Sequence, residues 1–306
     1  MLDTPILFLI FNRPDTTERV FERIKQAKPK QLFIAADGPR KSVHNEMQLC
    51  DKTRAIISKI DWRCEVKTLF RDENLGCGKA VSQAISWFFE HVEEGIILED
   101  DCLPHPSFFT FCSIMLEKYR NEPTVWQISG TNFLFGQRPN QYNYTYYFSA
   151  YSAIWGWATW KRCWKDFTLN IPDWRINIPN LLSERIKSSE MQNWILKMYL
   201  ANESKSMDTW DIQWSYHFHN ENGLSITPIN NLIQNIGIHG SHFSHRTPFH
   251  NMQTKTISFD NLYMSKINPP LSIQHEIDTI AFENILKRKL PLIRRVLTKI
   301  KRIFKI

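Results

Sequence analysis

The sequence has no long apolar run, no glycine–serine linker, no internal repeat and few cysteines. No stretch approaches the roughly 18 consecutive apolar residues that a membrane-spanning helix requires. The six cysteines occur singly, without the close pairs of a zinc site or the density of a disulfide scaffold. The short apolar run 5–11 follows Asp3 rather than a basic segment, so it predicts a buried strand and not a signal peptide. We therefore expect a cytoplasmic protein.

The body of the chain has no excess of positive charge, and the net positive charge comes from its end. The 306 residues carry 38 Lys+Arg and 31 Asp+Glu, a net charge of +7. Residues 287–306 hold nine basic residues and no acid, which leaves residues 1–286 at −2. The body therefore lacks the basic footprint of a nucleic-acid-binding protein, and no nucleic-acid partner is expected. At 42% hydrophobic and 23% charged residues, the composition predicts a globular chain with a sizeable core.

The basic end of the chain has the pattern of an amphipathic helix. Apolar residues in 287–306 recur at spacings of three and four, with basic residues on the other side. Such a helix either lies on an anionic membrane surface or packs its apolar side on the body of the protein. On a membrane, each basic residue would contribute on the order of 1 kcal/mol. The first alternative predicts a peripheral protein on the inner face of the cytoplasmic membrane.

The first half of the chain alternates short apolar runs with helical patterns. We expect strands at residues 6–11, 32–36, 66–70, 96–98 and 126–129, with helices between them. Asp15, with Glu18 three residues later, is expected to cap the first helix. This succession predicts an α/β fold, with a mainly parallel sheet flanked by helices. Ligands of such sheets bind at the carboxyl ends of the strands.

Polar residues follow the first two predicted strands. Asn12 and Arg13 come after the first strand, and Asp37 comes after the second. The planar guanidinium of Arg13 can pair with a phosphate, and Asp37 can accept hydrogen bonds from a base or ribose. The other interpretation is ordinary turn chemistry, because both Asn-x-Pro and Asp-Gly are common in turns.

A glycine-containing loop follows the third strand and leads into a helix. Gly76 and Gly78 would let the backbone approach a ligand, and Lys79 adds positive charge in the first helical turn. These features suit a diphosphate. The spacing is not that of a phosphate-binding P-loop, since four intervening residues and the Ser/Thr after the lysine are missing.

Three consecutive carboxylates, Glu99, Asp100 and Asp101, follow the fourth strand. Buried negative charge of this density is costly unless a cation or a hydrogen-bonding ligand is present. Oxygen ligands of this kind suit Mg²⁺ or Mn²⁺ together with the phosphates of a nucleotide. The alternative is an acidic cap for a helix that begins near Pro106, although a cap requires one carboxylate and not three.

These motifs, in this order, resemble the GT-A fold glycosyltransferases, most nearly N-acetylglucosaminyltransferase I and its bacterial relatives. The first half contributes Asn-Arg, Asp-Gly, Asn-x-Gly and Ile-Leu-Glu-Asp-Asp, the last followed by Pro106 to Phe109. The second half contributes Ser129 to Asn132, Trp155-Gly156-Trp157 and Trp210-Asp211. The resemblance covers roughly residues 5–244. The chain departs from the family pattern at Trp155, where the family has glycine.

The resemblance implies a Rossmann-like GT-A fold and metal-dependent, inverting transfer of a sugar from a nucleoside diphosphate sugar, with UDP as the expected nucleotide. The acceptor would be a hydroxyl of a glycan or of a lipid-linked glycan, and the cofactor would be Mn²⁺ or Mg²⁺. Glu99 would lie near the donor sugar, Asp100 near the ribose and Asp101 on the metal. The remaining donor contacts would be Phe11, Asn12, Arg13, Asp37, Asn74, Gly76 and Lys79. The acceptor contacts would be Trp155, Gly156 and Trp157.

Two carboxylates compete for the role of general base, and a histidine-rich loop follows them. The Trp-Asp motif favours Asp211, and Asp208 is expected to cap the helix that contains Asp211. His239, His242 and His245 recur at a spacing of three. A zinc site of three histidines is one interpretation. We instead expect at most one of them, His242 or His245, to contact the metal or the donor, and assign His242 to the metal.

The division of the chain that follows from these motifs is a catalytic domain at 1–250, an extension at 251–286 and the basic tail at 287–306. Within the domain, residues 1–130 would bind the nucleotide sugar and residues 131–250 would supply the acceptor half. Two other functions stay open. One is a nucleotidyltransferase, which normally has a glycine-rich basic signature at the position of Asn12 to Asp15. The other is a non-catalytic module that binds a nucleotide sugar or a membrane.

Overall fold

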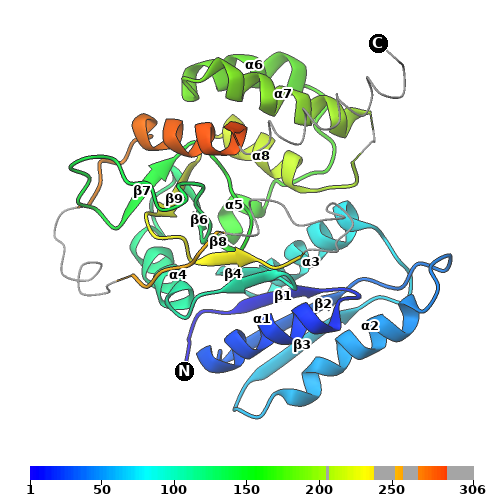
Figure 1. Ribbon diagram of the computed structural model, residues 1–306. Coiled ribbons are helices and arrows are strands. Elements are labelled where there is room, and N and C mark those ends of the chain that lie inside the picture. The colour runs from blue at the N-terminus through cyan, green and yellow to red at the C-terminus, as the bar shows by residue number, and fades with distance from the viewer. Residues whose placement is uncertain (205–206, 238–251, 258–267, 288–306) are drawn as a thin grey trace, which may run out of the picture.

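The computed structural model describes residues 1–204, 207–237, 252–257 and 268–287 (Figure 1). The predicted α/β architecture is confirmed, since helices flank one eight-stranded sheet whose strand order is β3-β2-β1-β4-β8-β6-β9-β7. Its strands are β1 (Ile6–Ile10), β2 (Gln31–Ala36), β3 (Glu65–Phe70), β4 (Glu94–Glu99), β6 (Val125–Ser129), β7 (Tyr146–Ser149), β8 (Trp157–Trp160) and β9 (Leu224–Pro228). A separate antiparallel pair joins β5 (Cys102–Pro104) to β10 (Ile233–Asn235).

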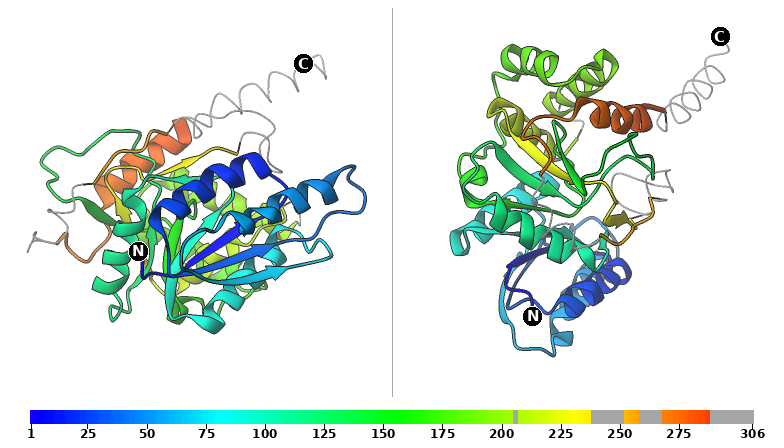
Figure 2. Two further views of the ribbon diagram at one scale, coloured as in Figure 1. Left: turned by 90° about the horizontal axis from the view of Figure 1, so that it is seen from below. Right: turned by 90° about the vertical axis from the view of Figure 1, so that its left-hand side faces the viewer.

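The described helices are α1 (Pro14–Ala27), α2 (Glu46–Arg54), α3 (Cys77–His91), α4 (Ser107–Lys118), α5 (Lys161–Trp164), α6 (Trp174–Arg185), α7 (Ser189–Glu203) and α8 (Asp211–Asn220). A 3₁₀ helix, Ala55–Lys59, follows α2, and residues 275–287 are also helical. The helices α6, α7 and 275–287 lie together beyond the β7 and β9 end of the sheet (Figure 1; Figure 2, right).

The parallel half of the sheet is built from the apolar runs of the first hundred residues. β1 pairs in parallel with both β2 and β4, and β2 pairs in parallel with β3. All five residues of β1 are buried, as expected for a strand that is covered on both faces. The continuous apolar sequence of β1 therefore follows from its central position. The carboxyl ends of these four strands meet at one edge.

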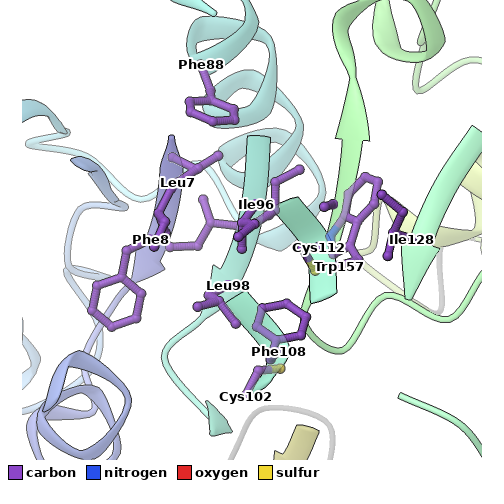
Figure 3. Packing of buried hydrophobic residues seen from close by; sticks show 14 of the residues in the cluster. Leu7, Phe8, Phe88, Ile96, Leu98, Cys102, Phe108, Cys112, Ile128 and Trp157 are labelled. Atoms are coloured by element: carbon purple, nitrogen blue, oxygen red, sulfur yellow. The ribbon is translucent and has the colours of Figure 1, made fainter. Parts of the chain in front are cut away.

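Helices cover both faces of this parallel half. Figure 3 shows the Phe88 ring of α3 on the Leu7 side of the sheet, and the Phe108 ring of α4 on the side of Phe8 and Leu98. All five side chains are fully buried. The alternation of Leu7 and Phe8 between the two faces is the period of two that a strand imposes on its side chains. Leu98 lies beside Phe8 in the β1–β4 register.

The sheet continues without a break into the second half of the chain. β8 runs antiparallel to β4 and to β6, and β9 runs parallel to β6. The strands from the segment 1–130 and from the segment 131–250 therefore belong to the same sheet. The division of the chain into 1–250, 251–286 and 287–306 stays a proposal.

The helix starts differ from the capping predictions. The predicted cap by Asp15 is wrong, because α1 begins at Pro14 with Arg13 at the N-cap and no side-chain cap. Proline suits the first helical position since it has no N–H to satisfy. The acidic-cap interpretation of residues 99–101 is also wrong, because β5 intervenes and α4 has no side-chain cap. Nor does Asp208 cap α8, whose N-cap is Trp210.

A second core joins β7 to the helix 275–287. Ile277, Ala281 and Phe282 are buried there with Tyr147. Asp278 lies in this apolar setting, where it accepts hydrogen bonds from the Ser149 hydroxyl at 2.6 Å and from the Ala150 amide at 2.8 Å. Burial raises the pKa of Asp278 to about 7, against the opposing effects of these hydrogen bonds and of the Arg185 charge.

We expect the Asp278→Asn substitution to raise the free energy of unfolding at pH 8 by about 1–2 kcal/mol. The folded-state pKa of Asp278 lies above its ordinary value of 3.8. Between about pH 4 and pH 7, the folded protein therefore holds a proton on Asp278 that the unfolded chain has lost. The free energy of unfolding therefore falls as pH rises from about 4 to about 7. Asparagine does not titrate, so the variant should lose this pH dependence of the free energy of unfolding. Urea unfolding from pH 5 to pH 8 measures the dependence in both proteins. The exposed Glu283→Gln on the same helix is the control, and an unchanged pH slope in Asp278→Asn would contradict the assignment.

Several predictions fall outside the described residues. They concern the histidine loop, with His239, His242 and His245, and the basic tail at 288–306. Within the described part of the chain, no helix combines the length and apolar character that crossing a bilayer takes.

Candidate active site

The predicted donor residues gather at the carboxyl ends of β1, β2 and β4. Arg13 follows β1, Asp37 follows β2, and the carboxylate cluster, which we define as Glu99, Asp100 and Asp101, lies at the end of β4. β1 lies between β2 and β4 in the sheet (Figure 1). The arrangement places these residues where ligands bind in sheets of this kind.

Arg13 joins two members of the carboxylate cluster. Its Nη1 donates to Asp101 Oδ2 at 2.7 Å, and its Nη2 donates to Asp100 Oδ1. The Phe11 amide donates to the second oxygen of Asp100 at 3.2 Å. The Asp100 side chain is only 2% exposed, whereas that of Asp101 is 13% exposed. Asp100 is therefore fixed by protein groups, and Asp101 is the more accessible of the two.

One guanidinium faces three carboxylates, and the pKa values reflect this imbalance. Burial raises the pKa of Glu99 to about 8, and the charge of Asp101 acts in the same direction. Burial also raises the pKa of Asp100 to about 6, with Arg13 opposing it. Burial disfavours the charged form of Arg13, but the attraction of Asp100 and Asp101 outweighs it and raises the pKa of Arg13. The site thus retains an excess of negative charge.

The carboxylates of this site suit a divalent cation that is held partly by the protein and partly by a bound substrate. Among the described residues no group of three or more His, Cys, Asp or Glu could hold a metal by itself. Mg²⁺, however, usually takes one or two carboxylates and completes its shell with water and substrate phosphates. Asp101 would hold such a cation, because it is a carboxylate, it is accessible, and the excess negative charge favours a cation beside it.

The backbone that follows β9 returns to cover Asp101. β10 pairs with β5 directly after the carboxylate cluster, and the Ile236 amide donates to the Asp101 carbonyl oxygen at 2.8 Å. A Cβ atom at Gly237 would clash with Asp101 Oδ2. Glycine at this position therefore lets the backbone approach the Asp101 carboxylate.

Asp37 organises the loop after β3. Its carboxylate accepts hydrogen bonds from the amides of Gly38, Leu75 and Gly76 and from Asn74 Nδ2, over 2.9 to 3.1 Å. Burial raises the pKa of Asp37 against these hydrogen bonds. Asp37 and Asn74 therefore hold the loop after β3 in place, a role that the sequence did not reveal. Their contact with a donor stays a proposal.

A buried glutamate near the end of β1 was missed by the sequence analysis. Glu46 is 1% exposed and accepts hydrogen bonds from Asn12 Nδ2 at 2.7 Å and from the Arg40 amide at 2.6 Å. The Arg40 guanidinium also pairs with Glu46 and lies 5.7 Å from the centre of the Phe11 ring. Glu46 therefore orients the predicted donor residues Phe11 and Asn12. No short motif marks it, because its partners lie 6 and 34 residues away.

The glycine loop before α3 does not present free amides. The Gly76 amide donates to Asp37, and the Cys77 and Gly78 amides donate to Asp208 at 2.8 Å and 3.0 Å. Lys79 is exposed. Protein carboxylates accept the hydrogen bonds of these amides, so a diphosphate would have to compete with Asp37 and Asp208, and donor binding by Gly76 and Lys79 stays a prediction.

Asp211 borders a pocket. It is the first residue of α8, and its Oδ1 accepts a hydrogen bond from the Thr209 hydroxyl. Its charge contributes to the raised pKa of Glu99, although burial is the main cause of that shift. Of the two predicted bases, Asp211 is the one that borders the pocket.

We call the pocket beside Asp211 the aromatic pocket, and its volume is about 200 Å³. Most of its lining is apolar, and Asp211, Ser215 and the buried Tyr199 bring polar atoms to it. Its lining consists of Phe133, Tyr151, Ser152, Ala153, Ile154, Trp155, Trp194, Ile195, Met198, Tyr199, Met207, Asp211, Ile212 and Ser215. A pocket with aromatic walls and a few polar groups is typical of a small-ligand site.

The three predicted acceptor residues have different surroundings. Trp155 is half-buried and lines the aromatic pocket. Trp157 is only 1% exposed and packs in the core, where Figure 3 shows it beside Ile128. Gly156 is buried at a φ of 61°, and a Cβ atom there would clash with Ile233. We therefore retain Trp155 as an acceptor candidate and interpret Trp157 and Gly156 as packing residues.

Comparisons with known proteins give weak similarities. No protein-family model matches the sequence, and no curated protein matches it. Among solved structures, apo UDP-glucose pyrophosphorylase is 12% identical with a TM-score of 0.39, over 74% of this chain and 90% of that one. HddC from Yersinia pseudotuberculosis is 10% identical with a TM-score of 0.33, over 54% and 80% of the two chains. The inositol-1-phosphate CTP transferase from T. maritima is 10% identical with a TM-score of 0.30, over 54% and 74%.

None of these three proteins is named as a glycosyltransferase. At such TM-scores the similarities carry no argument about the site. The resemblance to N-acetylglucosaminyltransferase I therefore stays a prediction from the motifs.

Proposed function

We propose that the chain is a transferase acting on a nucleoside diphosphate sugar, and that it moves the sugar to a hydroxyl of a glycan or lipid-linked glycan. The observation that carries the proposal is the position of Asp211. It borders the aromatic pocket, and Asp208, three residues earlier, contacts the start of α3 beside the loop that Asp37 organises. An inverting glycosyl transfer requires a base that takes the proton of the attacking hydroxyl.

The donor side is the edge of the sheet with Arg13 and the carboxylate cluster. The leaving diphosphate develops negative charge, which Arg13 and a divalent cation on Asp101 would neutralise. That cation supplies Lewis-acid stabilisation when bound. In the proposal, Asp37 and the Asn12 region contact the base and ribose, and Glu99 faces the sugar.

The acceptor side is the aromatic pocket. Aromatic rings such as Trp155 and Tyr151 stack on the apolar faces of sugars. During transfer, the acceptor oxygen forms a bond to the anomeric carbon as the bond to the diphosphate oxygen breaks. The diphosphate leaves with that electron pair, and Asp211 takes the proton of the attacking hydroxyl. Attack from the side opposite the leaving group inverts the configuration.

Nucleotidyl transfer is the second candidate, because a sheet edge with a carboxylate site for a metal can serve that chemistry as well. Such a reaction binds a nucleoside triphosphate and releases pyrophosphate. Against it, the segment after β1 reads Asn12-Arg13-Pro14-Asp15 and lacks the glycine-rich basic signature that such enzymes normally have at this position. The products separate the two candidates, since sugar transfer releases a nucleoside diphosphate.

A nucleotide screen tests the proposed donor site. We expect one of UDP, GDP and CDP to raise the melting temperature with Mn²⁺ and to have a much smaller effect with EDTA. A ligand at 100 times its Kd stabilises the folded state by about 2.7 kcal/mol, which a thermal shift assay resolves. UDP is the expected nucleotide.

The control variant for this screen is Asp101→Asn, which should remove the metal-dependent part of the shift. The matched Asp173→Asn, at an exposed position before α6, should leave it unchanged. The absence of any shift with all three nucleotides would contradict the proposal and favour a binding module of another kind.

A further inference from the structure

We infer that Asp208 is a positioning residue that caps α3 from a distant part of the chain and thereby holds Asp211 at the donor site. The inference rests on the proposed function for the role of Asp211, while the cap itself is independent of it. The sequence predicts Asp208 as a competing base and as the cap of its own helix, whereas its contacts with α3 assign it a different role.

The carboxylate of Asp208 binds the first two amides of α3. Its Oδ2 accepts from the Cys77 amide at 2.8 Å, and its Oδ1 accepts from the Gly78 amide at 3.0 Å. The amides of a helical first turn have no partners within the helix, and a carboxylate is favoured there by the helix dipole. No side chain near Gly76 in the sequence caps α3. Asp208, more than 120 residues away in the chain, therefore takes the place of a local cap.

The glycines of the loop are explained by the same contact. A Cβ atom at Gly76 would clash with Asp208 Oδ2, and one at Gly78 would lie 2.8 Å from Asp208 Oδ1. Gly76 also has a φ of 81°, which disfavours other residues. Gly78 has no such backbone requirement. Its lack of a side chain is required by the approach of Asp208 and of the Thr209 carbonyl oxygen, which a Cβ atom would meet at 3.0 Å.

Asp211 is connected to this cap by only two residues, and both are held in place. Thr209 donates to Asp211 Oδ1. Trp210 is 2% exposed and stacks on Trp157 with ring centres 5.7 Å apart. Three residue steps span at most about 10 Å of chain. The contact of Asp208 with α3 and the buried Trp210 therefore fix the start of α8. They also fix the position of Asp211, the first residue of that helix.

The hydrogen bonds separate the two aspartates. Both oxygens of Asp208 accept backbone amides of α3, so an acceptor hydroxyl would compete with these amides. Asp211 receives one hydrogen bond, from Thr209, and none from the other described residues. Asp211 also lines the aromatic pocket, which Asp208 does not. These differences assign proton transfer to Asp211 and positioning to Asp208.

Two variants test the inference, Asp208→Ala and Gly78→Ala. The first removes the carboxylate, and the second displaces it while leaving it in the chain. We expect each to lower kcat about 10-fold and to change the KM for the donor less than about 3-fold. The pH profile of kcat should keep its acidic limb, since the base is still present. Asp208→Asn should recover part of the loss, because the amide oxygen still accepts one hydrogen bond.

Gly78→Ala is the sharper variant because alanine is the better helix former, by about 1 kcal/mol, so a loss cannot come from helix propensity. Gly136→Ala is not a usable control for Gly78→Ala. Gly136 has a positive φ, which disfavours alanine, whereas Gly78 has no such backbone requirement. Ser189→Ala, at the first position of α7 and away from this contact, is the matched control and should leave kcat unchanged.

Amide hydrogen exchange by NMR provides a readout that does not depend on activity. In Asp208→Ala the Cys77 and Gly78 amides should exchange at least 10-fold faster. The Trp214 amide, which donates to the Trp210 carbonyl oxygen at 3.0 Å, should also exchange faster because the start of α8 is released. Unchanged exchange at these amides would overturn the inference, whether or not a donor has been found.

Two activity results would also overturn it. Loss of the acidic limb in Asp208→Ala would make Asp208 the base. A KM for the donor that falls in Asp208→Ala would show that the carboxylate occupies a phosphate site. A wild-type protein that binds no nucleotide and transfers no sugar would instead reject the proposed function, while the exchange measurement would still decide the cap.

Discussion

The Asp211→Asn substitution is expected to lower kcat about 10³-fold and to leave the thermal shift by nucleotide and Mn²⁺ unchanged. Proton transfer by a positioned base contributes roughly 10²- to 10⁴-fold to a rate. Asparagine has nearly the same shape and can still accept the hydrogen bond from Thr209, so the local structure should be retained. Initial rates with the donor identified by the nucleotide screen, together with the thermal shift, measure the two effects separately.

The control for Asp211→Asn is again Asp173→Asn, which makes the same chemical change outside the pocket. It should retain wild-type turnover. Near-normal turnover in Asp211→Asn would reject Asp211 as the base. A loss of the nucleotide shift would instead indicate that Asp211 is needed for donor binding.

The second large effect is on stability. Replacing Arg13 with glutamine is expected to lower the free energy of unfolding by about 3 kcal/mol, because it leaves the buried Asp100 and its neighbour Asp101 without a cationic partner. Mn²⁺ should restore part of the loss, since a cation on Asp101 replaces the missing positive charge. Urea unfolding with and without Mn²⁺ measures both effects.

Arg120→Gln is the matched control for Arg13→Gln. Arg120 forms a similar pair with Glu94, but its side chain is 51% exposed. Exposed pairs contribute about 0–1 kcal/mol, so the loss should be small. Arg13→Lys keeps the charge without the planar fork and should fall between the two. Equal losses in Arg13→Gln and Arg120→Gln would contradict the account of the buried cluster.

The fold and the gathering of polar residues at one edge of the sheet could be predicted because they depend on local signals. Apolar runs such as residues 6–10 identify strands, and the carboxyl ends of parallel strands meet at one edge. Arg13 and Asp101, 88 residues apart, could therefore be placed together before any contact was known. The sequence pattern is informative wherever the sheet itself brings residues together.

The contacts that depend on the packing of distant segments could not be predicted. The contact of Asp208 with α3 spans 130 residues, and a local helix cap was the natural expectation for this aspartate. The surroundings of the aromatic residues in the second half of the chain could not be predicted either. Trp155 lines a pocket and Trp157 is buried, yet the two tryptophans differ in the sequence only by their positions around Gly156.

The antiparallel pairing of β5 with β10 has a consequence for the order of folding. Cys102 pairs with Asn235, so the loop that must close contains more than 130 residues. The β1–β2 and β2–β3 pairs close much shorter loops, and non-local contacts are reached later since their loop-closure entropy must be overcome first. During synthesis the parallel strands can thus assemble while β10 is still inside the ribosome. The carboxylate cluster acquires its cover over Asp101 only afterwards, so this edge of the sheet is completed after the sheet that supports it.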